Sequence, residues 1–120
     1  MVPSMAEEGL VSEEMAKATP FAAMTVSWLL LDQEAAQLVE GLDLREEPKP
    51  GAAHLAVQLA LERPGERQFK LAGVMVTLLR VYQEAERHPT EVSFTAAWDY
   101  TRAALAIRDE LRELATIRHA

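Results

Sequence analysis

Histidine and acidic side chains are the groups in this 120-residue chain that are best suited to metal chemistry, but their spacing argues against a metal site. His54, His88 and His119 are too far apart to form the i, i+4 pair with which a helix binds zinc. Glu84 and His88 are four residues apart and can share a helix face, yet a di-iron bundle requires Glu-x-x-His on two helices. We therefore predict no metal site and no cofactor.

The serines and glycines show no pattern typical of covalent catalysis or phosphate binding. No serine lies in a Gly-x-Ser-x-Gly turn, and the five glycines form no phosphate-binding loop. Ser27 is predicted to donate its hydroxyl to a carbonyl one helical turn back. Cysteine is absent, which excludes thiol nucleophiles, disulfides and Cys-ligated zinc. We expect no enzymatic activity and no catalytic residue. The alternative hypothesis is a helical bundle that binds a small molecule or a metal in a pocket between Trp28 and Met75, either as a binding protein or as an enzyme.

Charge disfavours a nucleic-acid partner. The net charge is −7, and residues 1–60 hold ten acidic and three basic side chains, whereas residues 61–120 hold nine of each. Acidic side chains also separate the arginines near the C-terminus, which weakens their field. A regulator that contacts nucleic acid through these arginines is the third hypothesis. The cluster consists of Arg102, Arg108, Arg112 and Arg118.

The elements that must position these side chains are predicted to be helices. In the stretch 69–82 almost every residue is apolar, and the polar positions step by three and four, so they mark a single line along a helix. A helix with one narrow polar line must be covered by neighbours over most of its circumference. No stretch alternates with a period of two, so we expect no strands. The polar line, which continues beyond residue 82 toward the end of the helix, consists of Lys70, Gly73, Thr77, Arg80, Glu84 and Arg87.

The remaining start and stop signals complete an all-α fold. Thr19-Pro20 is typical of a helix start, and two prolines interrupt the charged loop at 43–50. Residues 1–18 are predicted to form a flexible acidic arm, partly disordered or holding one short helix that Ser12 is able to cap. The domain at 19–120 is predicted to be an antiparallel bundle of four main helices, over residues 20–41, 51–62, 66–87 and 92–117.

Cellular location is inferred from what the chain lacks. No apolar stretch is long enough to span a bilayer, and the first residues lack the positive region of a secretory signal. Together with the absence of cysteine, this favours the cytoplasm. The absence of asparagine and the excess of arginine over lysine are typical of a GC-rich genome, so we expect a bacterial source.

The apolar surface on these helices exceeds what four helices, one of them short, are able to cover. The sequence therefore predicts a non-enzymatic interaction module, which forms a homodimer or binds another protein through its central and C-terminal helices. The expected interface residues are Met75, Leu79, Tyr82, Leu105, Arg108 and Leu111.

Overall fold

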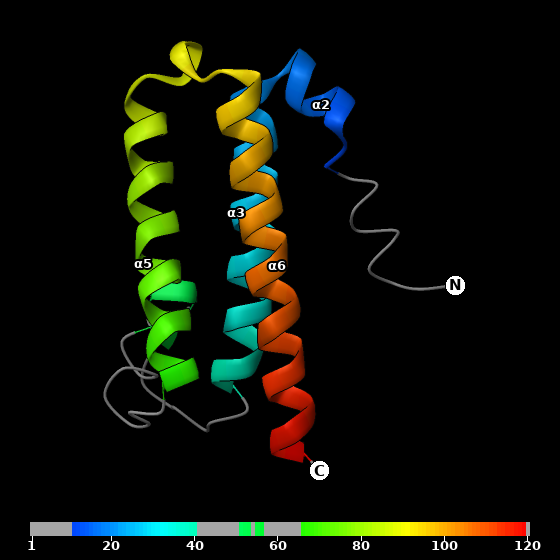
Figure 1. Cartoon of the computed structure of the whole chain (residues 1–120), viewed down its shortest axis with the longest axis vertical. Coiled ribbons are helices and arrows are strands. Elements are labelled where there is room, and N and C mark those ends of the chain that lie inside the picture. The colour runs from blue at the N-terminus through cyan, green and yellow to red at the C-terminus, as the bar shows by residue number, and fades with distance from the viewer. Residues whose placement is uncertain (1–10, 41–50, 54, 57–65, 120) are drawn as a thin grey trace.

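The computed structural model describes residues 11–40, 51–53, 55–56 and 66–119. Within this part of the chain there is no strand, so the predicted all-α class is confirmed. None of its helices is long and apolar enough to cross a membrane. The elements, shown in Figure 1, are α2 (Glu13–Ala18), α3 (Pro20–Glu40), α5 (Glu66–Arg87), the 3-10 helix η1 (Pro89–Glu91) and α6 (Phe94–His119).

Serine side chains cap the starts of α2 and α6. Ser12 is the N-cap of α2, where its Oγ accepts a hydrogen bond from the Met15 N–H at 3.1 Å. At the start of α6, the Ser93 Oγ accepts from the Ala96 N–H, also at 3.1 Å. α3 begins at Pro20, directly after Thr19, as predicted.

Several sequence predictions concern residues outside the described part of the chain. These include most of the N-terminal arm, the end of the first long helix at Gly41, and the charged loop at 43–50. Of the predicted helix 51–62, four residues are described as helical: Ala52, Ala53, Leu55 and Ala56.

Asp32 of α3 anchors this short helical segment. Its Oδ1 accepts a hydrogen bond from the Ala52 N–H at 2.8 Å, which satisfies a donor that the first turn of a helix leaves free. Gly51 precedes the segment, and a Cβ added at this position would collide with the Asp32 carboxylate. A larger residue at position 51 would therefore displace the Asp32 carboxylate from this place.

The long helices differ in direction. Ser27 contacts Thr101 and Glu34 contacts Arg112, so α3 and α6 run parallel. α5 runs antiparallel to both, as Figure 1 shows, and the predicted antiparallel arrangement thus applies to α5 and its two neighbours. α2 lies across the end of the bundle where α3 and α6 begin.

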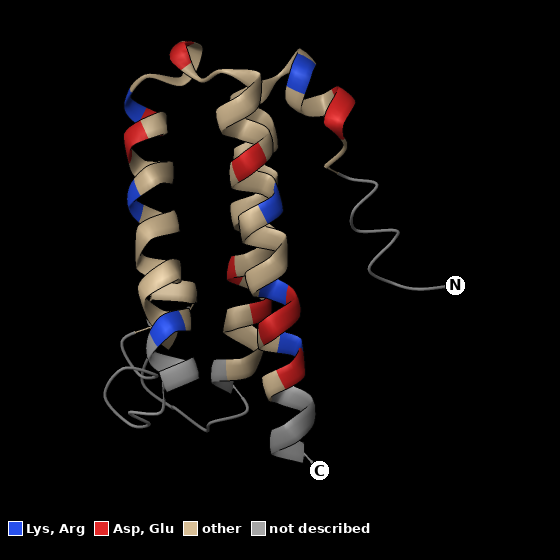
Figure 2. Cartoon of the chain, in the orientation of Figure 1, with Lys and Arg blue, Asp and Glu red and all other residues tan. Residues whose placement is uncertain are grey.

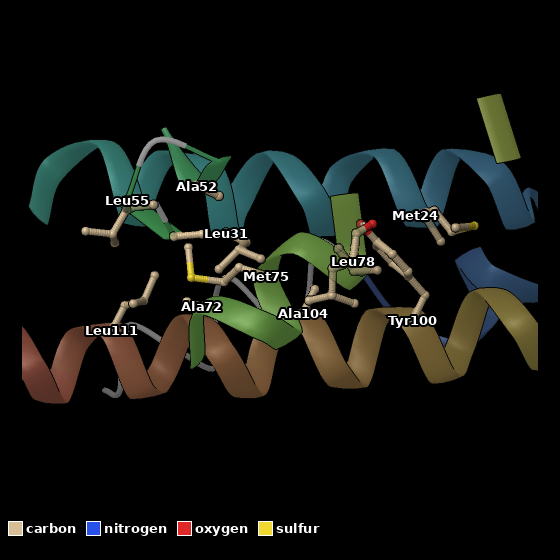
Figure 3. Close-up of a cluster of buried hydrophobic side chains, with 14 of the residues drawn as sticks. Met24, Leu31, Ala52, Leu55, Ala72, Met75, Leu78, Tyr100, Ala104 and Leu111 are labelled. Atoms are coloured by element: carbon tan, nitrogen blue, oxygen red, sulfur yellow. Dashed lines mark hydrogen bonds between the residues drawn. The ribbon is translucent and has the colours of Figure 1, made fainter. Parts of the chain in front are cut away.

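The core lies between α3, α5, α6 and the segment at 52–56 (Figure 3). Its large side chains include Leu31, Leu55, Met75 and Leu111, all at most 1% exposed. α3 and α6 form the most extensive contact of the described helices. Small, fully buried residues let the two backbones approach closely. They are Ala23, Ser27 and Ala35 on α3, and Ala97, Thr101 and Ala104 on α6.

Two tyrosines add aromatic and hydrogen-bond contacts between α5 and its neighbours. The ring of Tyr82 stacks on Phe21 and on Trp28, with centroid distances of 5.7 and 6.2 Å. Its hydroxyl lies 3.1 Å from the Thr25 Oγ1. From α6, the buried Tyr100 hydroxyl donates to the Leu78 carbonyl at 3.0 Å, and burial raises the pKa of Tyr100 above its usual value. These contacts hold one face of α5 and leave the opposite face uncovered by the other described helices.

Candidate functional site

Three of the six predicted interface residues are buried inside the protein. Met75, Arg108 and Leu111 are each at most 1% exposed, and Met75 and Leu111 belong to the hydrophobic core. Their burial disfavours a contact with another chain, and their part in an interface stays a prediction. The Arg108 Nη2 donates to the Oδ1 of Asp109, its neighbour in sequence, at 3.3 Å.

The other three predicted residues, Leu79, Tyr82 and Leu105, are half-buried. Tyr82 is held in its aromatic stack, whereas Leu105 lines a hollow of about 400 Å³ on the other side of α6, together with Trp98 and Val11. Whether Leu79 and Leu105 contact another chain stays a prediction.

Two of the four clustered arginines do not contribute to an open basic surface. Arg108 is buried, and the Arg112 Nε donates to the Glu34 Oε1 of α3 at 2.7 Å. The pair joins the two parallel helices and neutralises the charge of Arg112. This arrangement leaves a nucleic-acid-binding role without support from the described arginines.

An apolar surface that the sequence did not single out lies along α5. Val74 is 39% exposed and Val81 is 44% exposed, and their spacing of seven residues places them on one face of the helix. Together with α6, this face forms a shallow groove of about 650 Å³, which we call the α5 groove. Its lining residues are Lys70, Gly73, Val74, Thr77 and Leu78 of α5, and Ala103 of α6.

The apolar face continues beyond the groove toward η1. A second hollow, of about 350 Å³, is lined by Val81 and Ala85 of α5 and by Val92 and Ala96 near the start of α6. Val81, which lines the second hollow, follows Thr77 and Leu78 of the α5 groove by about one helical turn. The apolar surface extends over at least two turns of the helix.

The second hollow also contains polar side chains, but it does not resemble an active site. The His88 Nδ1 lies 3.2 Å from the Glu91 Oε2, and both side chains are largely exposed to water. Ser93 also lines the hollow, where its hydroxyl accepts the Ala96 N–H as a helix cap. Among the described residues, no group of three or more His, Asp or Glu is placed to hold a metal ion.

The predicted alternative pocket between Trp28 and Met75 does not appear among the hollows that the described residues line. Trp28 stacks on Tyr82, and Met75 is 1% exposed within the core. Neither side chain lines the three hollows described above.

Part of the signal for the α5 groove was present in the sequence. Gly73 and Thr77 belong to the predicted polar line, and both are exposed. Val74 and Val81 border this line, but residue type alone does not tell which apolar positions a neighbouring helix covers. The arrangement as a whole offers a helix-sized apolar surface.

No family model, no curated protein and no solved structure matches this chain.

Proposed function

We propose that this protein is a non-enzymatic interaction module that acts in the cytoplasm and receives a helix, from a second copy or from another protein, in the α5 groove. The observation that carries the proposal is the exposure of Val74 and Val81 beside an apolar groove of about 650 Å³. Figure 2 shows the long uncharged stretch in the middle of α5. In sequence, this stretch extends from Leu71 to Leu79.

The groove has the properties of a helix-binding surface. Contiguous apolar surface on a soluble protein commonly marks a site of association, because covering it removes the surface from water. Residues at helical spacing, such as Val74 and Val81, are the usual anchors when a helix enters a groove. Gly73 has no other group within 4 Å of the position that a Cβ would occupy, so a partner is able to approach the α5 backbone closely.

The experiment compares Val74→Lys and Val81→Lys with the matched control Leu29→Lys. Leu29 is 49% exposed on α3, so the control adds the same charge at an exposed apolar position outside the groove. Each purified chain is examined by light scattering over a range of concentrations, and by mass after purification from its native host. Circular dichroism checks the fold.

We expect the wild type and Leu29→Lys to form the same assembly, and the two valine variants to revert to folded protomers. Loss of a desolvated anchor weakens association by roughly tenfold or more. If all four chains show the same mass in both preparations, the groove is not an association surface and the proposal is wrong.

A further inference from the structure

We infer that the occupant of the α5 groove is a second copy of this chain, with the two α5 helices packed antiparallel about a two-fold axis that passes beside Thr77. This inference rests on the proposed function and specifies the partner and its orientation. It is drawn from the shape and the charge of the exposed face of α5.

The exposed face of α5 is centred on Thr77. At 100° per residue, its members lie within about 60° of Thr77 on either side of the helix. All are exposed, and they are distributed symmetrically before and after Thr77 in sequence. Such a distribution is what a two-fold interface requires, because each residue meets the one at the mirrored position. The members are Lys70, Gly73, Val74, Thr77, Arg80, Val81 and Glu84.

The shape of this face is self-complementary. In the antiparallel arrangement Gly73 of one copy lies opposite Val81 of the other. The position of a Cβ on Gly73 is open space, whereas Val81 is a projecting side chain that is 44% exposed. The arrangement therefore places a projecting valine over an open glycine twice, once on each side of the axis.

Thr77 is suited to its place beside the axis. Its Oγ1 donates to the Gly73 carbonyl at 3.0 Å, within its own helix. Because the hydroxyl donor is already satisfied, the side chain is able to turn its methyl group toward the axis without leaving a donor unpaired.

The charges at the two ends of the face have opposite sign. Lys70 of one copy meets Glu84 of the other, and this pair also occurs twice. Fourteen residues separate the two on one helix, about 21 Å, so they do not pair with each other within a single α5, where Glu84 contacts Arg87 at 3.5 Å. A parallel arrangement would instead place Lys70 against Lys70 and Glu84 against Glu84, which is repulsive. Antiparallel helices also oppose their dipoles favourably.

The first test exchanges these charges. We expect Lys70→Glu and Glu84→Lys each to weaken the dimer roughly tenfold, because two attractive pairs become two repulsive pairs. The double variant restores the attraction and returns the dissociation constant to within about threefold of wild type. Glu86→Lys is the control, since it makes the same charge change on α5 outside the face. A double variant no tighter than its weaker parent contradicts the inference.

The second test uses the absence of cysteine in the chain, so that each introduced thiol is the only one. Under mild oxidation Thr77→Cys should cross-link to itself, because disulfides form only at short Cα separations. Gly73→Cys and Val81→Cys should cross-link when mixed and remain uncross-linked when each is alone. Self-cross-linking of Gly73→Cys would indicate a parallel pair and overturn the inference.

The outcomes separate this inference from the proposed function. A wild-type chain that is a monomer at all concentrations overturns the second-copy inference, while a valine-dependent complex with a different protein would still support the interaction module. A dimer that Val74→Lys disrupts, but whose cross-links are parallel, likewise overturns only the inference.

Discussion

The contact between α3 and α6 and the groove beside α5 use similar small residues, but one is closed and the other is open. Ala97 and Ala104 of α6 are fully buried against α3. Ala103 lies on the same helix and faces the α5 groove, where Gly73 has open space above it. Small residues alone therefore do not show whether a helix surface is already covered by a neighbouring helix or is open to a partner.

The hydroxyls of Ser27 and Thr77 sharpen this comparison. Each donates to a carbonyl four residues back in its own helix, at 2.7 and 3.0 Å. Ser27 is buried and also reaches the Thr101 Oγ1 across the α3–α6 contact at 2.9 Å, whereas Thr77 is exposed. In the α3–α6 contact, the buried hydroxyl of Ser27 thus has a hydrogen-bond partner on a second helix, as buried polar groups usually do.

The largest expected difference between the two regions concerns apolar burial. Leu31→Ala should lower the free energy of unfolding by about 3 kcal/mol, since Leu31 is fully buried in the core. Val74→Ala, on the exposed face, should change the stability of the protomer by less than about 0.5 kcal/mol. Urea unfolding at low protein concentration measures both. Equal losses would show that the groove is part of the core.

Tyr100→Phe tests how α5 is attached to α6. Removing the hydroxyl deletes its buried hydrogen bond to the Leu78 carbonyl, which should lower the free energy of unfolding by about 1.5 kcal/mol.

The same variant should alter the response to alkaline pH. Burial, reinforced by the charge of Tyr82, raises the pKa of Tyr100 in the folded protein above its unfolded value near 10. The folded state therefore holds the proton more tightly, and wild-type stability decreases as the pH rises above about 10. Unfolding measured between neutral and alkaline pH should show a shallower decrease in Tyr100→Phe. Identical slopes would argue against burial of this hydroxyl.

Thr101→Val and Thr77→Val form a smaller matched pair. Thr101→Val removes the partner of Ser27 inside the α3–α6 contact and should lower stability by about 1 kcal/mol. Thr77→Val makes the same replacement on an exposed surface and should be close to neutral in the protomer. Thermal unfolding of the two variants decides the comparison, and the reverse order would contradict it.

The smallest effect is expected at the ion pair between Glu34 and Arg112. Arg112→Gln should lower the free energy of unfolding by about 0.5 kcal/mol, because both side chains keep some contact with water. Added salt should reduce this difference. Arg102→Gln, at an exposed position on the same helix, is the control. An effect that high salt leaves unchanged would indicate packing by the arginine stem instead.

The sequence predicted the features that depend on neighbours in the chain. The cap at Ser12, the end of α5 at Arg87, and the bond from Ser27 to the preceding turn are all local, and the structure confirms them. The burial of Arg108 and the exposure of Val81 were not predicted. Both depend on which helix lies beside them, and hydrophobic periodicity does not specify this.

The parallel direction of α3 and α6 was likewise beyond the sequence pattern. Periodicity identifies an apolar face but not the order in which three helices meet around a core. For the same reason Met75 and Leu111 were expected at an interface, although both belong to the hydrophobic core.

The stack of Tyr82 on Trp28 also gives the protein a built-in optical probe. The two tryptophans report on different places, since Trp28 contacts α5 through Tyr82, whereas Trp98 lines the hollow beside Val11. In a chain that carries Trp98→Phe, the single remaining indole lies against α5. Its emission would then follow the release of α5 from α3, separately from events at the N-terminal end of the bundle.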